Sequence, residues 1–361
     1  MEKLAKTDLI LFSVILPLSI LMRVPGLLYP LEFSGDEMGY LAKALKFGTG
    51  DLNPHYFVHP ALSFYITFVA EAVFFVFGYF LGFFHSVSEF STLFFNNPAP
   101  FLFAGRLPSL LFGAGTIYLV YLMGKNFFSK EVAICTALML AITPLHIFES
   151  QTIRIRSIAT FFGILCLYFI FTILKKGEKK DYVLAGLSLG LCLATEYTMI
   201  FFTLPLFTVI ILNLQNKFFL KNGPTVSPKK GILFALSIAL AILITCTPYT
   251  FFDYPANFKN ITHFLNFGID PTTVSNGNTV PEVSQGFHSE DINTNYVQAI
   301  VIVKQYISRV YYQIAHLFNL EYTIGKMFAT VSIAGVLFAI YKREKEKERL
   351  TTLCSPLAGF L

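Results

Sequence analysis

An adjacent pair of acids, Asp36-Glu37, is the first feature of this sequence that could carry out chemistry. A positioned carboxylate can take the proton from an attacking hydroxyl group as a general base. Cationic side chains can neutralise the charge that builds on a departing phosphate, and arginine does so with a bidentate fork. Cationic residues near the ends of apolar runs are Arg23, His59, Arg106, Arg154 and Arg156. These residue types suit the transfer of a group from a phosphate ester.

The elements that must position these residues are membrane helices. The chain has 361 residues, of which 55% are hydrophobic and 14% are charged, and its mean hydropathy is +0.62. A soluble domain carries roughly 25% charged residues, so this composition predicts a polytopic membrane protein. The formal charge of +5 then reflects basic cytoplasmic loops rather than nucleic-acid binding. The five cysteines are scattered and predict neither a metal finger nor a disulfide framework.

Nine apolar stretches are long enough to be considered as membrane spans. They are residues 8–28, 61–84, 101–124, 132–149, 158–174, 182–197, 198–214, 231–251 and 322–341. We expect the first to be an uncleaved helix rather than a signal peptide, because no small-residue cleavage site follows it. The chain stops shortly after a basic run, 342–349, in what looks like the start of another helix, which is consistent with a truncated form of a longer protein.

The basic clusters decide which stretches cross, because cytoplasmic loops carry an excess of Lys and Arg. The clusters are Lys3/Lys6, Lys125 to Lys130, Lys175 to Lys180, Lys217 to Lys230 and Lys342 to Arg349. If all nine stretches crossed, two clusters would lie outside, whereas all five lie inside if 61–84 does not cross. From just before this stretch, His59, Ser63, Thr67 and Glu71 follow at intervals of four, which places them along one side of a helix. Such a helix suits the membrane surface or a groove against other helices, although an ordinary span remains the alternative.

The predicted architecture is a single domain over residues 1–361 with about eight transmembrane helices. A first outer segment, 29–100, would contain the juxtamembrane helix 61–84, and a second outer segment would cover 252–321. The acid pair, His59 and the arginines then all meet the outer face. Taken singly, the acids can be a solvated loop pair and the arginines can be interfacial anchors. Taken together, the outer arginines break the positive-inside pattern, which favours a chemical role.

The order of these motifs resembles the GT-C glycosyltransferases, in particular the protein O-mannosyltransferases and the bacterial aminoarabinose transferase of lipid A. The family has an acid pair after the first helix with an aromatic residue three positions later, matched here by Asp36-Glu37 and Tyr40. A turn, Gly50-Asp51, and a helix opening, His59-Pro60, follow in the family order. An arginine then opens the next true span, matched by Arg106 in Arg106–Gly113, and Arg23 matches an arginine near the end of the first helix. The resemblance covers roughly residues 8–215.

This resemblance implies a GT-C-type bundle and an inverting transfer of a mannose-like hexose from a polyprenyl-phosphate donor, with polyprenyl phosphate leaving. It implies that Asp36 is the catalytic base and that Glu37 positions the acceptor or the donor. Supporting residues would be Tyr40 and Glu196. The donor phosphate would bind His59, Arg106, Arg23, Arg154 and Arg156.

Two positions depart from the family pattern. Arg156 stands where relatives commonly have Asp, and Glu196 stands where they commonly have Lys. We therefore expect these two side chains to face each other as an ion pair with its sense reversed. Because the missing Asp could hold a metal in some relatives, we predict no metal and no other cofactor.

The implied partners are a polyprenyl-phosphate sugar, a protein, lipid or glycan acceptor and the lipid bilayer, with no nucleic acid. The implied location is a plasma membrane, with the catalytic face outside. A transporter or lipid flippase is the competing class, but charged residues are sparse at mid-span and no internal repeat is seen. An inactive relative that serves as a partner subunit is a third alternative.

Overall fold

The computed structural model of the chain describes residues 6–28, 36–214 and 227–255, and its regular elements there are all helices. The described residues fall within one compact unit, Met1–Thr279. Five described helices are long and apolar enough to cross a membrane: Thr7–Leu28, Leu62–Phe80, Ala99–Phe127, Ile155–Lys176 and Pro228–Cys246. The predicted all-α, polytopic membrane fold is therefore confirmed.

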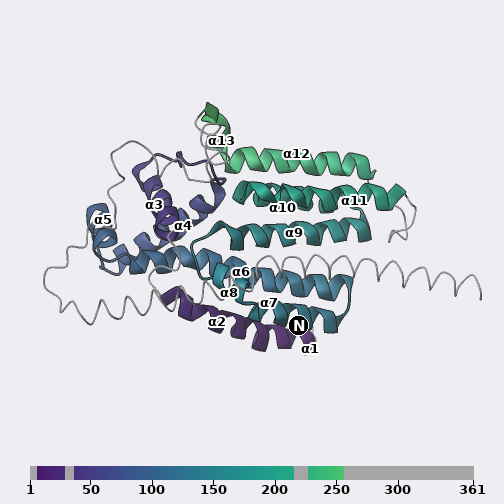
Figure 1. Ribbon diagram of the computed structural model, residues 1–361, viewed down its shortest axis with the longest axis horizontal. Coiled ribbons are helices and arrows are strands. Elements are labelled where there is room, and N and C mark those ends of the chain that lie inside the picture. The colour runs from purple at the N-terminus through teal and green to yellow at the C-terminus, as the bar shows by residue number, and fades with distance from the viewer. Residues whose placement is uncertain (1–5, 29–35, 215–226, 256–361) are drawn as a thin grey trace, which may run out of the picture. The chain divides into compact units, whose positions relative to one another are not determined.

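The bundle consists of long helices that run side by side (Figure 1). The first run comprises α1 (Lys6–Ile10), a π-helical turn (Leu11–Ile15) and α2 (Leu16–Leu28). The others are α6 (Ala99–Phe127), α7 (Lys130–Ile142), α9 (Ile155–Lys176), α10 (Lys179–Thr195), α11 (Thr203–Leu214) and α12 (Pro228–Cys246). Helix α9 packs between α6 and α10, and α10 packs in turn on α12.

Small residues let α10 and α12 approach closely. A Cβ atom added to Gly186 would collide with the carbonyl oxygen of Ala235, and one added to Gly190 would lie 2.7 Å from that of Ala239. Glycines four residues apart lie on one face of a helix, where they allow the backbones of two membrane helices to meet. The absence of side chains at these two positions thus sets the spacing of the α10–α12 pair.

One predicted span is interrupted, and a single extended residue lies at the boundary expected between the spans 182–197 and 198–214. The stretch 132–149 forms α7 and a separate short helix, α8 (Pro144–Glu149). Thr143 between them is extended, because a residue that precedes proline is disfavoured in the helical conformation. Glu196 is likewise extended and separates α10 from a 3₁₀ helix, Tyr197–Phe202, that leads into α11. Both breaks lie at the end of the bundle where α2 ends (Figure 1).

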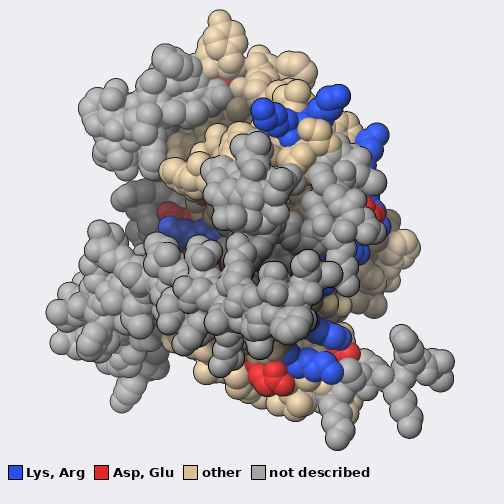
Figure 2. All heavy atoms as spheres, turned by 90° about the vertical axis from the view of Figure 1, so that its right-hand side faces the viewer, with Lys and Arg blue, Asp and Glu red and all other residues tan. Residues whose placement is uncertain are grey.

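Basic residues gather at the opposite end of the bundle, here called the lysine end. Helices α6 and α9 end there, and α7, α10 and α12 begin there (Figure 1). Its lysines are Lys125, Lys130, Lys175, Lys176, Lys179, Lys180, Lys229 and Lys230, and Figure 2 shows basic side chains at several places on this face. The described members of the predicted inner clusters therefore share one end, as the charge count requires.

The other end carries the short helices α3 (Glu37–Lys46), α5 (Val87–Asn96) and α13 (Pro248–Phe252) together with α4 (Leu62–Phe80) (Figure 1). The predicted polar stripe of α4 faces inward, because Ser63, Thr67 and Glu71 are all buried. Helix α4 packs on α3 and α6, so its stripe lies against other helices rather than on open surface. That α4 does not cross the membrane stays a prediction.

Several predicted features fall outside the described residues. These are the start of the first outer segment, most of the second outer segment, the last predicted span, 322–341, and the basic run 342–349.

Candidate active site

The two acids of the pair lie in different environments, although they are neighbours in the chain. Asp36 precedes the first turn of α3, and its side chain is 67% exposed. Glu37 begins α3 and is fully buried. Successive residues of a helix point about 100° apart, so the start of α3 turns one carboxylate outward and the next one inward. Only Asp36 is accessible to a substrate.

Glu37 forms a buried ion pair with Arg106 of α6. The guanidinium donates from Nε to Oε1 at 3.0 Å and from Nη2 to Oε2 at 2.8 Å. The Ile153 backbone amide also donates to Oε1 at 2.9 Å. Arg106 Nη1 donates to the carbonyl oxygens of Gly26 and Leu27, both at 3.2 Å. This pair joins α3 to α6, to the end of α2 and to the segment before α9.

The expected phosphate-binding role of Arg106 does not fit this geometry. Its side chain is 1% exposed and its donors are directed at Glu37 and at the end of α2. The role expected for Glu37 in holding acceptor or donor meets the same objection, because it is buried beneath α3. Both residues instead fix the backbone that presents Asp36.

Arg23 is also buried, which corrects its assignment to the donor phosphate. Its Nη1 donates to Ser19 and to the carbonyl oxygen of Ala141, at 2.7–3.1 Å. Its Nη2 lies 2.7 Å from Nδ1 of His146, which must accept and therefore carries no proton at that nitrogen. Arg23 thus ties α2 to α7 and α8 inside the protein.

Among the predicted arginines, Arg154 contacts Asp36 and Arg156 shares an acidic partner with Arg154. Arg154 Nη2 lies 3.3 Å from Oδ2 of Asp36, and its Nη1 lies 3.7 Å from Oε1 of Glu149. Arg156, which is 56% exposed, donates to the same Glu149 oxygen at 3.0 Å. Glu149 at the end of α8 therefore holds two cations close to the exposed acid.

His59 contacts Glu196 at the same end of the bundle. The His59 Nδ1 and the Glu196 Oε2 lie 3.4 Å apart, with side-chain exposures of 23% and 14%. The expected pairing of Glu196 with Arg156 is therefore wrong: among the described residues, these two form their ion pairs with His59 and with Glu149. Arg156 and Glu149 are neighbours because Glu149 ends α8, Arg156 lies in the first turn of α9, and only a short connection separates the two helices.

Tyr40 stands at the centre of these charges. Burial raises the pKa of Tyr40 to about 12, the charges of Asp36 and Glu196 add to the rise, and those of Arg154 and Arg156 oppose it. All four charged groups therefore lie close enough to act on one phenol. His59 also packs against the Tyr40 ring, at a centroid distance of 6.1 Å. Together with the four charged residues, this makes five predicted site residues around the Tyr40 ring.

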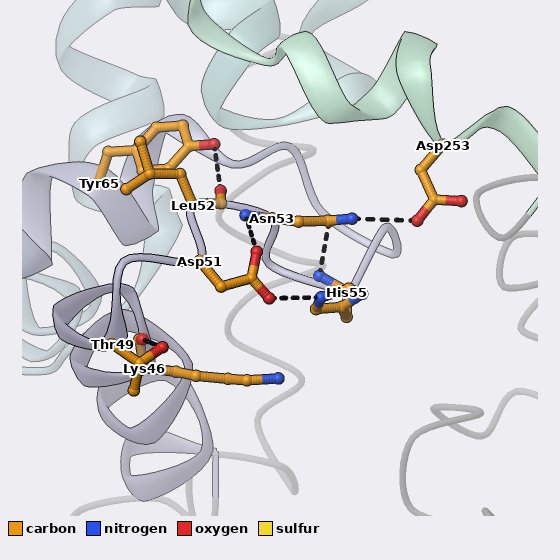
Figure 3. Close-up of polar contacts among 8 residues, drawn as sticks. All are labelled: Lys46, Thr49, Asp51, Leu52, Asn53, His55, Tyr65 and Asp253. Carbon is orange, nitrogen blue, oxygen red and sulfur yellow. Dashed lines mark hydrogen bonds and ion pairs between the residues drawn. The ribbon is translucent and has the colours of Figure 1, made fainter.

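The predicted Gly-Asp turn lies nearby in the first outer segment (Figure 3). Gly50 has a left-handed backbone, with φ at 91°, and Asp51 accepts from the Asn53 amide at 3.0 Å and contacts His55 at 2.8 Å. The Asn53 side chain donates to Asp253 beside α13 at 3.1 Å. These contacts are exposed and hold the turn against α13, so they frame the site rather than supply its chemistry.

Comparison with known proteins adds a family to this geometry. Residues 75–247 match the family described as dolichyl-phosphate-mannose-protein mannosyltransferase. The chain resembles a protein mannosyltransferase. A relative, the putative mannosyltransferase YkcB of Bacillus subtilis (strain 168), is 25% identical over 142 residues, or 39% of this chain and 20% of the relative. The aligned part thus spans about a fifth of that relative. No solved structure matches the chain.

Both matches support a glycosyltransferase of the GT-C, protein mannosyltransferase type, which confirms the resemblance seen in the sequence. The family match of this mannosyltransferase-like chain includes Arg106, Arg154, Arg156 and Glu196. Asp36 and His59 precede the matched range, so the match does not include them.

Sequence reasoning missed two residues of this candidate site. Glu149 was placed inside a membrane span, although an acid at the end of an apolar run, five and seven residues before two arginines, was a usable signal. Tyr56 packs beside His59 with a ring separation of 6.0 Å, and no sequence signal distinguished it from the other tyrosines. Within the described ranges, no group of three or more His, Cys, Asp or Glu side chains could hold a metal ion. The absence of a metal requirement stays a prediction.

Proposed function

We propose that this protein transfers a mannose-like hexose from a polyprenyl-phosphate donor to the hydroxyl group of a protein, lipid or glycan acceptor. The proposal places the reaction at the outer face of the membrane. The observation that carries it is the exposed carboxylate of Asp36 in contact with Arg154, which shares the acid Glu149 with Arg156. A base and two cations at one end of a membrane bundle suit an attack by a hydroxyl and the departure of a phosphate.

In the proposed reaction, Asp36 takes the proton from the acceptor hydroxyl. The hydroxyl oxygen forms a bond to the anomeric carbon from the side opposite the phosphate. The bond between that carbon and the phosphate oxygen breaks, and its electron pair stays with the polyprenyl phosphate. One displacement inverts the configuration at the anomeric carbon. No second nucleophile is needed, which agrees with a single exposed acid at the start of α3.

The cations that would bind the donor phosphate are Arg154, Arg156 and His59. Arg154 has a second role, because its contact with Asp36 at 3.3 Å is long for a hydrogen bond. A bound phosphate, which accepts strong charge-assisted bonds, would draw this guanidinium away from the weaker contact. Asp36 would then be free to accept the proton of the acceptor hydroxyl. Donor binding and activation of the base are thereby linked.

The test is sugar transfer by the purified protein in lipid, supplied with radiolabelled polyprenyl-phosphate mannose or polyprenyl-phosphate glucose. Wild type is compared with Asp36→Asn and with a matched control, Asp51→Asn, which removes another exposed acid of the same outer segment. We expect Asp36→Asn to reduce release of the sugar by at least ~10²-fold, as for loss of a general base. Asp51→Asn should retain most of the rate. Equal loss in both variants, or failure of the wild type to bind any polyprenyl phosphate, would contradict the proposal.

A further inference from the structure

The contact between His59 and Glu196 has an asymmetry that bears on the donor. Nδ1 of His59 is buried and lies 3.4 Å from Oε2 of Glu196, which is an ion-pair contact without the geometry of a hydrogen bond. Nε2 makes no hydrogen bond or ion pair with any residue in the described ranges. The ring is flanked by Tyr40 and Tyr56, with centroids at 6.1 and 6.0 Å. One nitrogen is therefore engaged by the protein and the other is left for a ligand.

Glu196 is well placed to act on this ring, because it is itself held. It is the extended residue between α10 and the 3₁₀ helix, and its Oε1 accepts from the Thr198 amide at 3.4 Å. Burial alone would raise the pKa of Glu196, but His59 and the bonds from Thr198 outweigh burial and lower it. An ionised carboxylate therefore lies against the buried face of the imidazole.

We propose that Glu196 is a positioning residue for the donor: its carboxylate keeps His59 protonated and directs the Nε2–H group at the donor phosphate. This inference rests on the proposed function, since it assumes that an anionic phosphate is bound here. A neutral imidazole offers a donor at only one nitrogen, whereas the protonated ring donates from both. Pairing with Glu196 through Nδ1 thus leaves a charged donor at Nε2.

Other charged groups lie around the two tyrosines that flank His59. Asp36, Arg154 and Arg156 act on Tyr40. Lys43 lies 4.3 Å from the centre of the Tyr56 ring. Glu196 is the one group of this set in direct contact with the imidazole. Its removal should therefore change the titration of His59 more than removal of any of the others.

The first measurement is the titration of the His59 imidazole by NMR, on full-length protein with labelled histidine, without any substrate. The signal is assigned by its loss in His59→Lys. An opposite charge at this range changes a pKa by about 1–3 pH units. We expect Glu196→Gln to lower the titration midpoint by at least about 1 pH unit and Glu196→Asp to restore part of the difference. An unchanged midpoint in Glu196→Gln would overturn the proposal.

The second measurement is the affinity for polyprenyl-phosphate mannose between pH 5 and 9 in lipid nanodiscs. Wild-type affinity should fall as the pH rises through the His59 titration, and Glu196→Gln should move this fall to lower pH. A titration midpoint that is lower by about one pH unit corresponds to about tenfold weaker binding on the alkaline side. His59→Lys keeps a cation at all these pH values, so adding Glu196→Gln to His59→Lys should change little.

The outcomes separate the two proposals. A loss of affinity in Glu196→Gln that is equal at every pH, or that persists on the His59→Lys background, indicates a merely structural role and overturns the inference. A midpoint that moves in the NMR titration without a matching change in donor binding overturns it as well. Failure of the wild type to bind the donor at any pH would instead remove the proposed function on which it rests.

Discussion

Loss of the buried Arg106 side chain should strongly destabilise this protein. We consider Arg106→Leu, which removes the partner of Glu37 without removing the apolar volume near the end of α2. Glu37 would keep the amide of Ile153 but lose both guanidinium bonds. The carbonyl oxygens of Gly26 and Leu27 would each lose a donor. A fully buried carboxylate would then face an apolar side chain.

The expected magnitude follows from burial of both charges, with side-chain exposures of 1% and 0%. Removal of one partner from a buried ion pair decreases the free energy of unfolding by about 3–5 kcal/mol. Replacing both partners with apolar residues is often close to neutral. We therefore expect Arg106→Leu to be severely destabilising and Glu37→Leu/Arg106→Leu to recover much of the loss. Lys125→Met is the matched control, because its pair with Asp8 is partly exposed and should contribute at most about 1 kcal/mol.

The assay is unfolding of the purified protein in mixed micelles at increasing denaturing detergent, with the double-mutant cycle measured at one pH. The cycle isolates the coupling between the two positions. Additive effects of the two single substitutions would refute the reasoning. So would an effect of Arg106→Leu no larger than that of Lys125→Met. In either case, the buried pair would not hold the end of α3 in place.

Three further predictions concern the helices around the site. The carboxylate oxygens of buried Glu71 have no hydrogen-bond partner among the described residues, so Glu71→Met should increase the free energy of unfolding by ~1–3 kcal/mol; a decrease in the same detergent assay would show that the acid has a partner. Gly190→Ala should destabilise by about 1–3 kcal/mol through collision with α12, whereas Gly39→Ala, whose Cβ would lie at an ordinary contact distance of 3.8 Å from the Lys43 Nζ, should be neutral or stabilising. Cysteines placed at Asp51 and His85 in a cysteine-free background should both react with an impermeant maleimide from the same side, because α4 is predicted not to cross; labelling from opposite sides would make α4 a true span.

The helical part of the fold could be predicted because the bilayer fixes the length of a spanning element. Basic clusters then identified a common end, since loops on one side of a membrane share their charge. The break at Thr143 was also readable in principle, because Pro144 follows it. It was missed because hydropathy averages over a window and does not register a single extended residue between two apolar helices.

The individual arginines could not be assigned from sequence. Arg23, Arg106 and Arg154 all stand near the ends of apolar runs, and a guanidinium can donate to a phosphate, a carboxylate or a carbonyl oxygen. Which acceptor it meets depends on residues far along the chain. The partner of Arg106 is 69 positions away and that of Arg23 is 123 positions away. Helix ends also leave carbonyl oxygens without partners, which is the acceptor that Arg106 meets at the end of α2.

The buried pair and the exposed acid are parts of one arrangement. Glu37 is tied to α6 and to the end of α2 through Arg106, and to the segment before α9 through the Ile153 amide, so the first residue of α3 cannot move without breaking buried bonds. Asp36 is the preceding residue, so its backbone position is fixed as well, whereas its exposed side chain can change partners. A base fixed at its backbone and held by one long contact to Arg154 can respond to a phosphate that competes for that arginine. On this reasoning, the adjacent acids differ in role: Glu37 fixes the start of α3, and Asp36 is the proposed base. We therefore expect Glu37→Gln to impair stability and activity together. We expect Asp36→Asn to impair activity alone.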